Sequence, residues 1–275
     1  MERLGLVAGA GSLPVEVARK SLEAGRSLYV VRLKSLAEAE LDDYPGGDAG
    51  LTEFGKIFKL LKDAGCKSVC MAGIVHRPEF RTLIPDLKGA ALLPGLMLAA
   101  RKGDDALLRA VVAAFEKEGF KVEGAQDVAS GLTLGAGPLG RIAPGKEHKE
   151  DIDRALEVAR AIGAMDIGQG AVVVDGLVLA VEAQEGTDAM LRRCAQLPEA
   201  IRGRPGDPRG VLAKAPKPIQ ERRIDLPTIG LATVHRVAAA GLAGIVGEAG
   251  GVIVLDREAV IAEADSLGLF IYGVE

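Results

Sequence analysis

The sequence is poor in aromatic residues, contains no tryptophan and has no excess of positive charge, since its formal net charge is −4. Proteins that bind single-stranded nucleic acid stack bases on aromatic side chains, and proteins that bind duplexes present clustered basic residues. The composition therefore argues against a nucleic-acid-binding protein. Hydrophobic residues make up 48% of the 275 residues, so a large core is available and wholesale disorder is excluded.

Cysteine is also scarce, with Cys66, Cys70 and Cys194 forming an odd and sparse set. Such a set excludes a disulfide framework and favours a reducing, cytoplasmic environment. Cys66 and Cys70 have no third and fourth ligand near them in the sequence, so a zinc site is not expected there. No uncharged apolar run approaches the ~20 residues of a membrane span, and the apolar run after Arg3 is too short for a signal peptide.

Short apolar segments alternate with helical patterns along the chain, which is typical of the α/β class. Strands are expected over residues 4–8 and 68–75, and the second is a near-continuous apolar run of the kind found in parallel sheets covered on both faces. A glycine-rich stretch without a clear period, residues 127–149, indicates a boundary. We therefore predict two α/β domains with a substrate cleft between them: residues 1–130, Rossmann-like with a mainly parallel sheet, and residues 131–275, carrying the catalytic motifs.

The second half contains a strong signal for a β-hairpin. Two apolar runs flank Asp175 and Gly176, and an Asp-Gly pair between such runs favours a tight hairpin turn. Further along the chain, a helix of small residues is expected over residues 234–246. A strand is expected over residues 251–255.

Residues near the ends of the expected N-terminal strands are candidates for ligand contact, because open α/β sheets bind ligands beyond the carboxyl ends of their strands. The first of these turns resembles a dinucleotide fingerprint only in part, because Pro14 stands at the place of the third glycine. For the turn at Gly11 and Ser12, the alternative is a plain tight turn without a ligand. For His76, the alternative is an ordinary polar residue at the end of a strand. The candidates are Gly11, Ser12, Gly73, His76 and Gln126.

The basic segment, residues 214–230, has neither a helical nor a strand period, and its three prolines stiffen it. Cations neutralise phosphate oxygens, and a positioned carboxylate holds a metal or orients water. The segment therefore suits phosphoryl or pyrophosphoryl chemistry, and a solvated basic loop is the alternative. Its charged residues are Lys214, Lys217, Glu221, Arg222, Arg223 and Asp225.

Glu182, Glu185 and Asp188 place three acids within seven residues, where a strand gives way to a helix. The start of the helix accounts for Asp188 as a capping residue, but it does not account for the two glutamates. Carboxylates that face a basic segment can bind Mg²⁺ or pair with its cations. Asp166 and Gln169, just before the hairpin, are expected in the same region.

Residues 83–98 form a mainly apolar stretch that is interrupted by prolines. Ordinary core packing is one explanation. The functional alternatives are a wall for an acyl chain and a surface that rests on a membrane. We expect part of this stretch to line an acyl pocket.

Several of these motifs together resemble the LpxI family of UDP-2,3-diacylglucosamine pyrophosphatases. They lie in residues 7–14, 103–105, 166–169, 181–188 and 214–230. The resemblance spans both halves of the chain, and the last two motifs are the longest and most specific. One position departs from the family pattern, because Glu221 stands where an aspartate is expected after Gln220.

The resemblance implies hydrolysis of the pyrophosphate bond of UDP-2,3-diacylglucosamine to UMP and 2,3-diacylglucosamine 1-phosphate (lipid X) in lipid A synthesis. It also implies dependence on Mg²⁺, a homodimer, a substrate held between the domains and an essential acid at Asp225. Because clustered oxygen ligands suit a hard cation, Mn²⁺ is expected to serve as well as Mg²⁺. We expect a cytoplasmic enzyme with peripheral contact to the cytoplasmic face of the inner membrane. Asp225 is the expected catalytic residue and, together with Glu185 and Asp188, an expected metal ligand. The expected substrate-binding residues are Gly11, Ser12, Gly73, Gln126, Asp166, Gln169, Lys214, Lys217, Gln220 and Arg223.

Two other functions compete with this hypothesis. A Rossmann oxidoreductase acting on a nucleotide sugar needs a fuller glycine fingerprint and an acid at the end of the second strand, which here ends at Arg32, Leu33 and Lys34. A non-enzymatic nucleotide-sugar-binding regulator explains the cations but not the clustered acids. No Walker A, zinc-protease or serine-hydrolase motif is present, so a hydrolase of this sequence would use carboxylates, basic residues and a hard metal.

Overall fold

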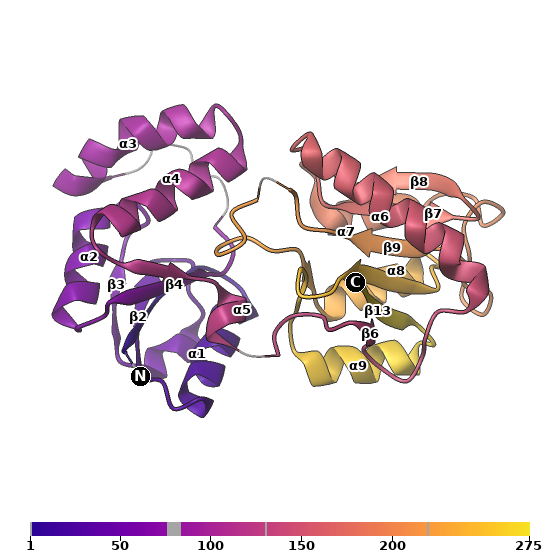
Figure 1. Cartoon of the computed structure of the whole chain (residues 1–275), viewed down its shortest axis with the longest axis horizontal. Helices are drawn as coiled ribbons and strands as arrows, with labels where there is room; N and C mark the ends of the chain where they lie inside the picture. Colours follow the sequence, from indigo (N-terminus) through magenta and orange to yellow (C-terminus); the bar gives the residue numbers. More distant parts are fainter. Residues whose placement is uncertain (1, 76–83, 130, 219) are drawn as a thin grey trace. The chain divides into compact units, whose positions relative to one another are not determined.

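The computed structural model describes residues 2–75, 84–129, 131–218 and 220–275 of the chain. The chain forms two compact units, shown in Figure 1. The first contains Met1–Ser130 together with Glu221–Asp225, and the second contains Gly131–Gln220 together with Leu226–Glu275. A short piece of the basic segment therefore belongs to the first unit, although its neighbours on both sides belong to the second. His76 and Leu83 lie outside the described residues.

The first unit is built on a parallel sheet of five strands in the order β3-β2-β1-β4-β5. Every neighbouring pair runs parallel. The central strand β1 is buried along its whole length, as expected of a strand covered on both faces. The expected mainly parallel sheet is therefore confirmed. The strands are β1 (Leu4–Ala8), β2 (Leu28–Leu33), β3 (Gly46–Ala49), β4 (Ser68–Ala72) and β5 (Lys121–Glu123).

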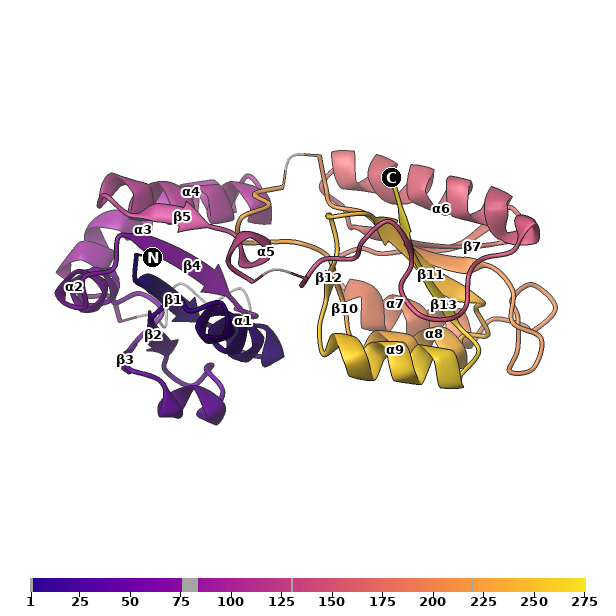
Figure 2. The same cartoon turned by 60° about the horizontal axis from the view of Figure 1, so that its bottom comes forward.

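Helices cover both faces of this sheet, with α1 on one side and α3 and α4 on the other in Figure 2. A cluster of phenylalanines from α2 and α4 fills the second face, and the rings of Phe58 and Phe115 meet edge to face with centroids 5.0 Å apart. Such pairs stabilise a core beyond the area they bury. The helices are α1 (Ser12–Glu23), α2 (Phe54–Asp63), α3 (Leu87–Ala100), α4 (Asp104–Lys117), α5 (Ala125–Val128) and the 3₁₀ helix η1 (Ala39–Asp43).

The second unit contains a mixed sheet in the order β6-β13-β11-β9-β7-β8 and a small parallel pair, β10 with β12. The helix α6 lies on one face, and α7, α8 and α9 lie on the other, as Figure 2 shows. The strands are β6 (Gly137–Pro138), β7 (Gly170–Val174), β8 (Leu177–Val181), β9 (Val211–Lys214), β10 (Thr228–Ile229), β11 (Gly244–Glu248), β12 (Ile253–Val254) and β13 (Phe270–Val274). The helices are η2 (Lys146–His148), α6 (Lys149–Ala164), α7 (Gly186–Ala195), α8 (Leu231–Ala239) and α9 (Arg257–Ser266).

The β-hairpin is confirmed, whereas the helix expected over residues 234–246 is wrong in its second half. β7 and β8 pair antiparallel around Asp175 and Gly176, whose φ angles are 50° and 77°, the left-handed geometry of a tight hairpin turn. The helix α8 ends at Ala239, and residues 244–248 form the central strand β11. A buried apolar run of small residues fits a helix and a strand equally well by period alone. The strand expected over residues 251–255 is observed only as the shorter β12, Ile253–Val254.

Among the described residues, none of the helices combines the length and the apolar character that crossing a bilayer requires.

Candidate active site

In the first unit, the turns after β1 and β4 pack directly on each other. Ala10 and Ile74 exchange two backbone hydrogen bonds of 3.0 and 2.8 Å. Gly73 has a φ of 98°, and a Cβ atom there would lie 2.8 Å from the carbonyl oxygen of Ala10, so glycine is required for this approach. The chain order of the sheet reverses between β1 and β4, which is where open α/β sheets bind ligands. The carboxyl ends of β1 and β4 are thus followed by turns that contain Gly11, Ser12 and Gly73. The contact of these residues with substrate stays a prediction.

A carboxylate of this chain already occupies one donor at the start of α1. The backbone N–H of Gly11 donates to Oε1 of Glu38 over 2.8 Å. The first N–H groups of a helix favour anions. A phosphate group that binds at this turn would therefore have to displace Glu38 from Gly11 or use the neighbouring N–H of Ser12.

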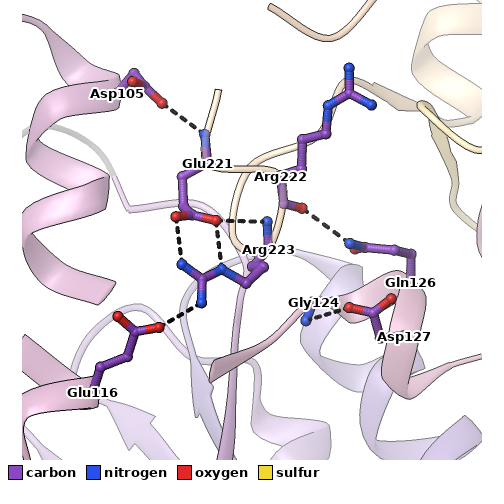
Figure 3. Close-up of polar contacts among 8 residues, drawn as sticks. All are labelled: Asp105, Glu116, Gly124, Gln126, Asp127, Glu221, Arg222 and Arg223. Carbon is purple, nitrogen blue, oxygen red and sulfur yellow. Dashed lines mark hydrogen bonds and ion pairs between the residues drawn. The ribbon is translucent and has the colours of Figure 1, made fainter. Parts of the chain in front are cut away.

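The residues that the basic segment contributes to the first unit are held by α4 and α5, as Figure 3 shows. Oδ1 of Asp105 accepts the backbone N–H of Glu221 over 2.8 Å. Nε2 of Gln126 donates to the carbonyl oxygen of Arg222 over 3.2 Å. The guanidinium of Arg223 donates to Glu116 over 2.7 Å. Asp105 and Gln126 therefore bind the backbone of the segment, and Glu116 binds the side chain of Arg223.

Glu221 and Arg223 form a two-pronged ion pair inside this docked turn. Two guanidinium nitrogens of Arg223 donate to the two carboxylate oxygens of Glu221 over 2.7 and 2.8 Å. These hydrogen bonds lower the pKa of the Glu221 carboxyl, and the two glutamates that Arg223 contacts raise its own pKa. Glu221, the residue that departs from the family pattern, thus has a side chain long enough to form a bidentate ion pair with Arg223. Such charge-assisted hydrogen bonds are strong.

The same turn fixes the backbone at Asp225. The N–H groups of Ile224 and Asp225 both donate to the carbonyl oxygen of Glu221, over 3.0 and 3.1 Å. Ile224 packs against the phenylalanine cluster of the first unit. Leu226, which follows Asp225, is buried. Asp225 therefore stands at the end of a short turn that is anchored on both sides.

Asp105 and Glu116 are site residues that the sequence did not reveal. Both lie on α4, and Asp105 in the first turn is explained by the helix dipole alone. In the structure Asp105 is only 4% exposed, and its second oxygen pairs with Arg109 over 2.8 Å. The one signal in the sequence was the place of Asp105 in the motif of residues 103–105, which belongs to the family resemblance.

In the second unit, four of the predicted substrate-binding residues form one polar network. Nζ of Lys217 donates to Asp166 over 2.8 Å, and the backbone N–H of Lys217 donates to Oε1 of Gln220 over 2.8 Å. Nε2 of Gln220 in turn lies 3.4 Å from Oε1 of Gln169. Asp166 has a φ of 56°, an unusual value for a residue other than glycine. Asp166 and Gln169 thus contact residues of the basic segment, and the role of all four in binding substrate stays a prediction.

Lys214 is buried at the end of β9, and its Nζ donates to the carbonyl oxygen of Thr228 over 2.8 Å. This bond joins the two ends of the part of the basic segment that belongs to the second unit. Lys214 thereby ties the entry of the segment to its exit.

The three clustered acids have separate structural partners. Glu182 is buried and accepts the hydroxyl of Thr187 over 3.0 Å. Glu185 pairs with Arg193 over 2.8 Å, which lowers the pKa of Glu185. Asp188 pairs with Arg236 over 3.1 Å. Glu185 and Asp188 thus have partners that account for them without a metal.

A metal held by protein side chains alone does not fit the part of the chain that the structure describes. No group of three or more histidine, cysteine, aspartate or glutamate side chains in those ranges is placed to hold an ion. Asp225 belongs to the first unit, whereas Glu185 and Asp188 belong to the second. Their joint role as metal ligands therefore stays a prediction, and we derive no chemical step from a metal at these residues.

Comparison with known proteins identifies the family. The model of the LpxI N-terminal domain matches residues 3–132, and the model of the LpxI C-terminal domain matches residues 135–272. The chain is 65% identical to the UDP-2,3-diacylglucosamine pyrophosphatase LpxI of Caulobacter vibrioides over 275 residues, which cover all of this chain and 98% of that protein. The resemblance inferred from the motifs is thereby confirmed, and the chain belongs to the LpxI family.

Proposed function

We propose that this protein hydrolyses the pyrophosphate bond of UDP-2,3-diacylglucosamine to UMP and 2,3-diacylglucosamine 1-phosphate, a step of lipid A synthesis. The observation that carries the proposal is the 65% identity, over the full chain, to a protein named for this activity. The geometry of the basic segment supports it independently, because cations and carboxylates are held there in fixed positions.

The cations of the basic segment suit the charge of a pyrophosphate. Lys217 is oriented by Asp166, and Arg222 has an exposed side chain while Gln126 holds its carbonyl oxygen. Charged donors that are positioned before the substrate arrives stabilise developing negative charge without reorganisation. In this proposal Lys217 and Arg222 contact phosphate oxygens, and Gln169 and Gln220 hold the backbone around Lys217.

Asp225 is the proposed catalytic residue. A carboxylate next to bound phosphates is useful when it takes a proton from the attacking water. The water oxygen bonds to one phosphorus, the bridging P–O bond breaks with its electron pair going to the leaving phosphate, and Asp225 accepts the proton. The docked turn of Glu221 to Ile224 fixes the position from which that carboxylate acts.

We further propose dependence on Mg²⁺ or Mn²⁺, action as a homodimer, and work in the cytoplasm with peripheral contact to the membrane that stores the substrate. The resemblance of the motifs supports these points. Magnesium is commonly bound through one or two carboxylates together with substrate phosphates, so a metal requirement does not need a preformed group of three protein ligands.

The test is release of UMP from UDP-2,3-diacylglucosamine by the purified protein, followed by chromatography. The Asp225→Asn variant keeps the shape of the side chain and removes its basicity, so we expect binding without turnover. Asp153→Asn on α6, an exposed acid paired with Lys149, is the matched control and keeps full activity. Absence of UMP release by the unaltered protein under all divalent-metal conditions refutes the proposal.

A further inference from the structure

The outer face of α3 is an apolar stripe. Leu87, Ala91, Pro94 and Leu98 follow one another at intervals of four, three and four residues, which places them on one side of a helix, and all four are exposed. Leu87 is 91% exposed and Leu98 is 58% exposed. Ile84, just before the helix, is 87% exposed. Large aliphatic side chains gathered this openly on one face mark an interaction site.

The opposite face of α3 is firmly packed, so the stripe is held in place. Gly89, Leu96 and Ala100 are buried, and a Cβ atom on Gly89 would lie 2.0 Å from the carbonyl oxygen of Thr52. Asp86 caps the helix by accepting the N–H of Gly89 over 2.7 Å and also accepts the N–H of Lys56 over 2.9 Å. The helix is therefore apolar on both sides, with one side turned to the core and the other to solvent.

The surroundings of the stripe favour a lipid partner. A shallow groove of about 440 Å³ runs beside its first turn, lined by Gly55, Asp86, Leu87, Lys88 and Ala91. Arg101 and Lys102, both exposed, follow the last turn directly. An aliphatic helical face that ends in exposed cations matches the chemistry of a bilayer surface, with acyl chains below anionic headgroups.

A second copy of the chain is the other natural occupant of such a face. The centre of a protein–protein interface is enriched in aromatic side chains. The stripe has none, since its members are leucine, alanine and proline. The aliphatic character and the adjoining cations therefore favour lipid over protein.

We propose that α3 is a membrane-docking helix that inserts its outer face into the surface of an anionic phospholipid bilayer. This inference rests on the proposed function, because a diacylated substrate resides in such a bilayer. Leu87 and Leu98 enter the acyl region, and Arg101 and Lys102 contact phosphate groups. The docked helix keeps the protein at the surface from which its substrate must be taken.

The natural absence of tryptophan provides a direct test. Leu98→Trp and Leu177→Trp each introduce a sole tryptophan at a leucine that is 58% exposed, the first on the stripe and the second on the β7–β8 hairpin. Vesicles of phosphatidylglycerol and phosphatidylcholine in equal parts are added without substrate. We expect the emission of Leu98→Trp to shift to the blue and to be quenched by lipids brominated in their acyl chains, and that of Leu177→Trp to stay unchanged.

A second measurement uses co-sedimentation with the same vesicles. The double variant Leu87→Gln, Leu98→Gln should bind at least about tenfold more weakly, because burial of one leucine side chain shifts a partition by that factor or more. Leu177→Gln is the control and binds as the unaltered protein does. Arg101→Gln with Lys102→Gln should weaken binding to anionic vesicles and leave binding to pure phosphatidylcholine unchanged.

Three results overturn the inference. One is an absence of any change in Leu98→Trp emission on adding vesicles, and another is an equal change in both tryptophan variants. The third is an emission of Leu98→Trp that is already blue-shifted without lipid and a dimer mass that Leu87→Gln, Leu98→Gln reduces, which assigns the face to a second copy. Because no substrate is present, these results are independent of whether UMP release is observed.

Discussion

The docking of the basic segment onto α4 leads to a sharp prediction about Asp105. Asp105→Ala removes the acceptor of the Glu221 N–H and the partner of Arg109. A hydrogen bond to a buried charged group contributes about 1.5–3 kcal/mol, which corresponds to a factor of about 10 to 150. We expect kcat/KM to fall by a factor in this range, mainly through kcat, because the turn that carries Asp225 loses its first anchor while the cations of the second unit are untouched.

Two matched variants separate this effect from a general loss of stability. Asp105→Asn keeps an oxygen that can accept the Glu221 N–H, so it should retain most of the activity. Asp104→Ala removes the other acid of the same first turn of α4 and with it a comparable dipole contribution. A loss of activity common to both alanine variants therefore reports the helix start, and only the additional loss in Asp105→Ala reports the contact with Glu221.

The assay is UMP release at several substrate concentrations, with a thermal melt of each variant. The reasoning is refuted when Asp105→Ala and Asp104→Ala lose the same activity, since Asp105 would then act only as a residue of the helix start. It is equally refuted when Asp105→Ala keeps full kcat.

Four further outcomes follow. Asp225→Ala should fold and bind substrate yet lose at least ~100-fold in hydrolysis, and parallel loss of binding by calorimetry would make it a binding residue. EDTA should abolish UMP release and Mg²⁺ should restore it, whereas full activity of metal-stripped protein contradicts the metal requirement. The hydrogen bonds from Arg223 lower the pKa of Glu221 in the folded state. The stability that this pair contributes is therefore present above the ordinary carboxyl pKa and is lost as the pH falls through the lowered pKa. The difference in melting temperature between the unaltered protein and Glu221→Gln should shrink only below about pH 4. Burial raises the pKa of Cys70 to about 12, so a thiol reagent at neutral pH should leave Cys70 unlabelled until the protein unfolds.

Features encoded by neighbouring residues were predictable from the sequence. The strand β1 and the β7–β8 hairpin follow from short apolar runs bounded by turn residues, and both were located correctly. The helix α8 and the strand β11 lie in one run of small residues, where Gly241 and its φ of 73° separate them and the periodicity does not. The choice between helix and strand there is made by packing against β9 and β13.

Contacts between distant residues were much less predictable. Asp105 and Glu221 are 116 residues apart in the chain, and nothing local to either one indicates the other. The network of Asp166 with Lys217 was anticipated as a region but not as a pairing. The acids at positions 185 and 188 were predicted to be metal ligands, and that role stays a prediction. Nothing local indicated that each of them pairs with an arginine of the fold. A sequence shows which charges exist, whereas the fold decides which of them meet.

The place of Glu221–Asp225 within the first unit has a consequence for dissecting the protein. A cut at the apparent boundary near residue 130 yields an N-terminal fragment without the turn that packs against its phenylalanine cluster. In that fragment Asp105, Glu116 and Gln126 lose the contacts that they make with the turn. The C-terminal fragment would carry that turn with nothing to receive it. The two halves are therefore complementary pieces, and the N-terminal fragment should recognise a synthetic peptide of residues 214–230 as its missing part.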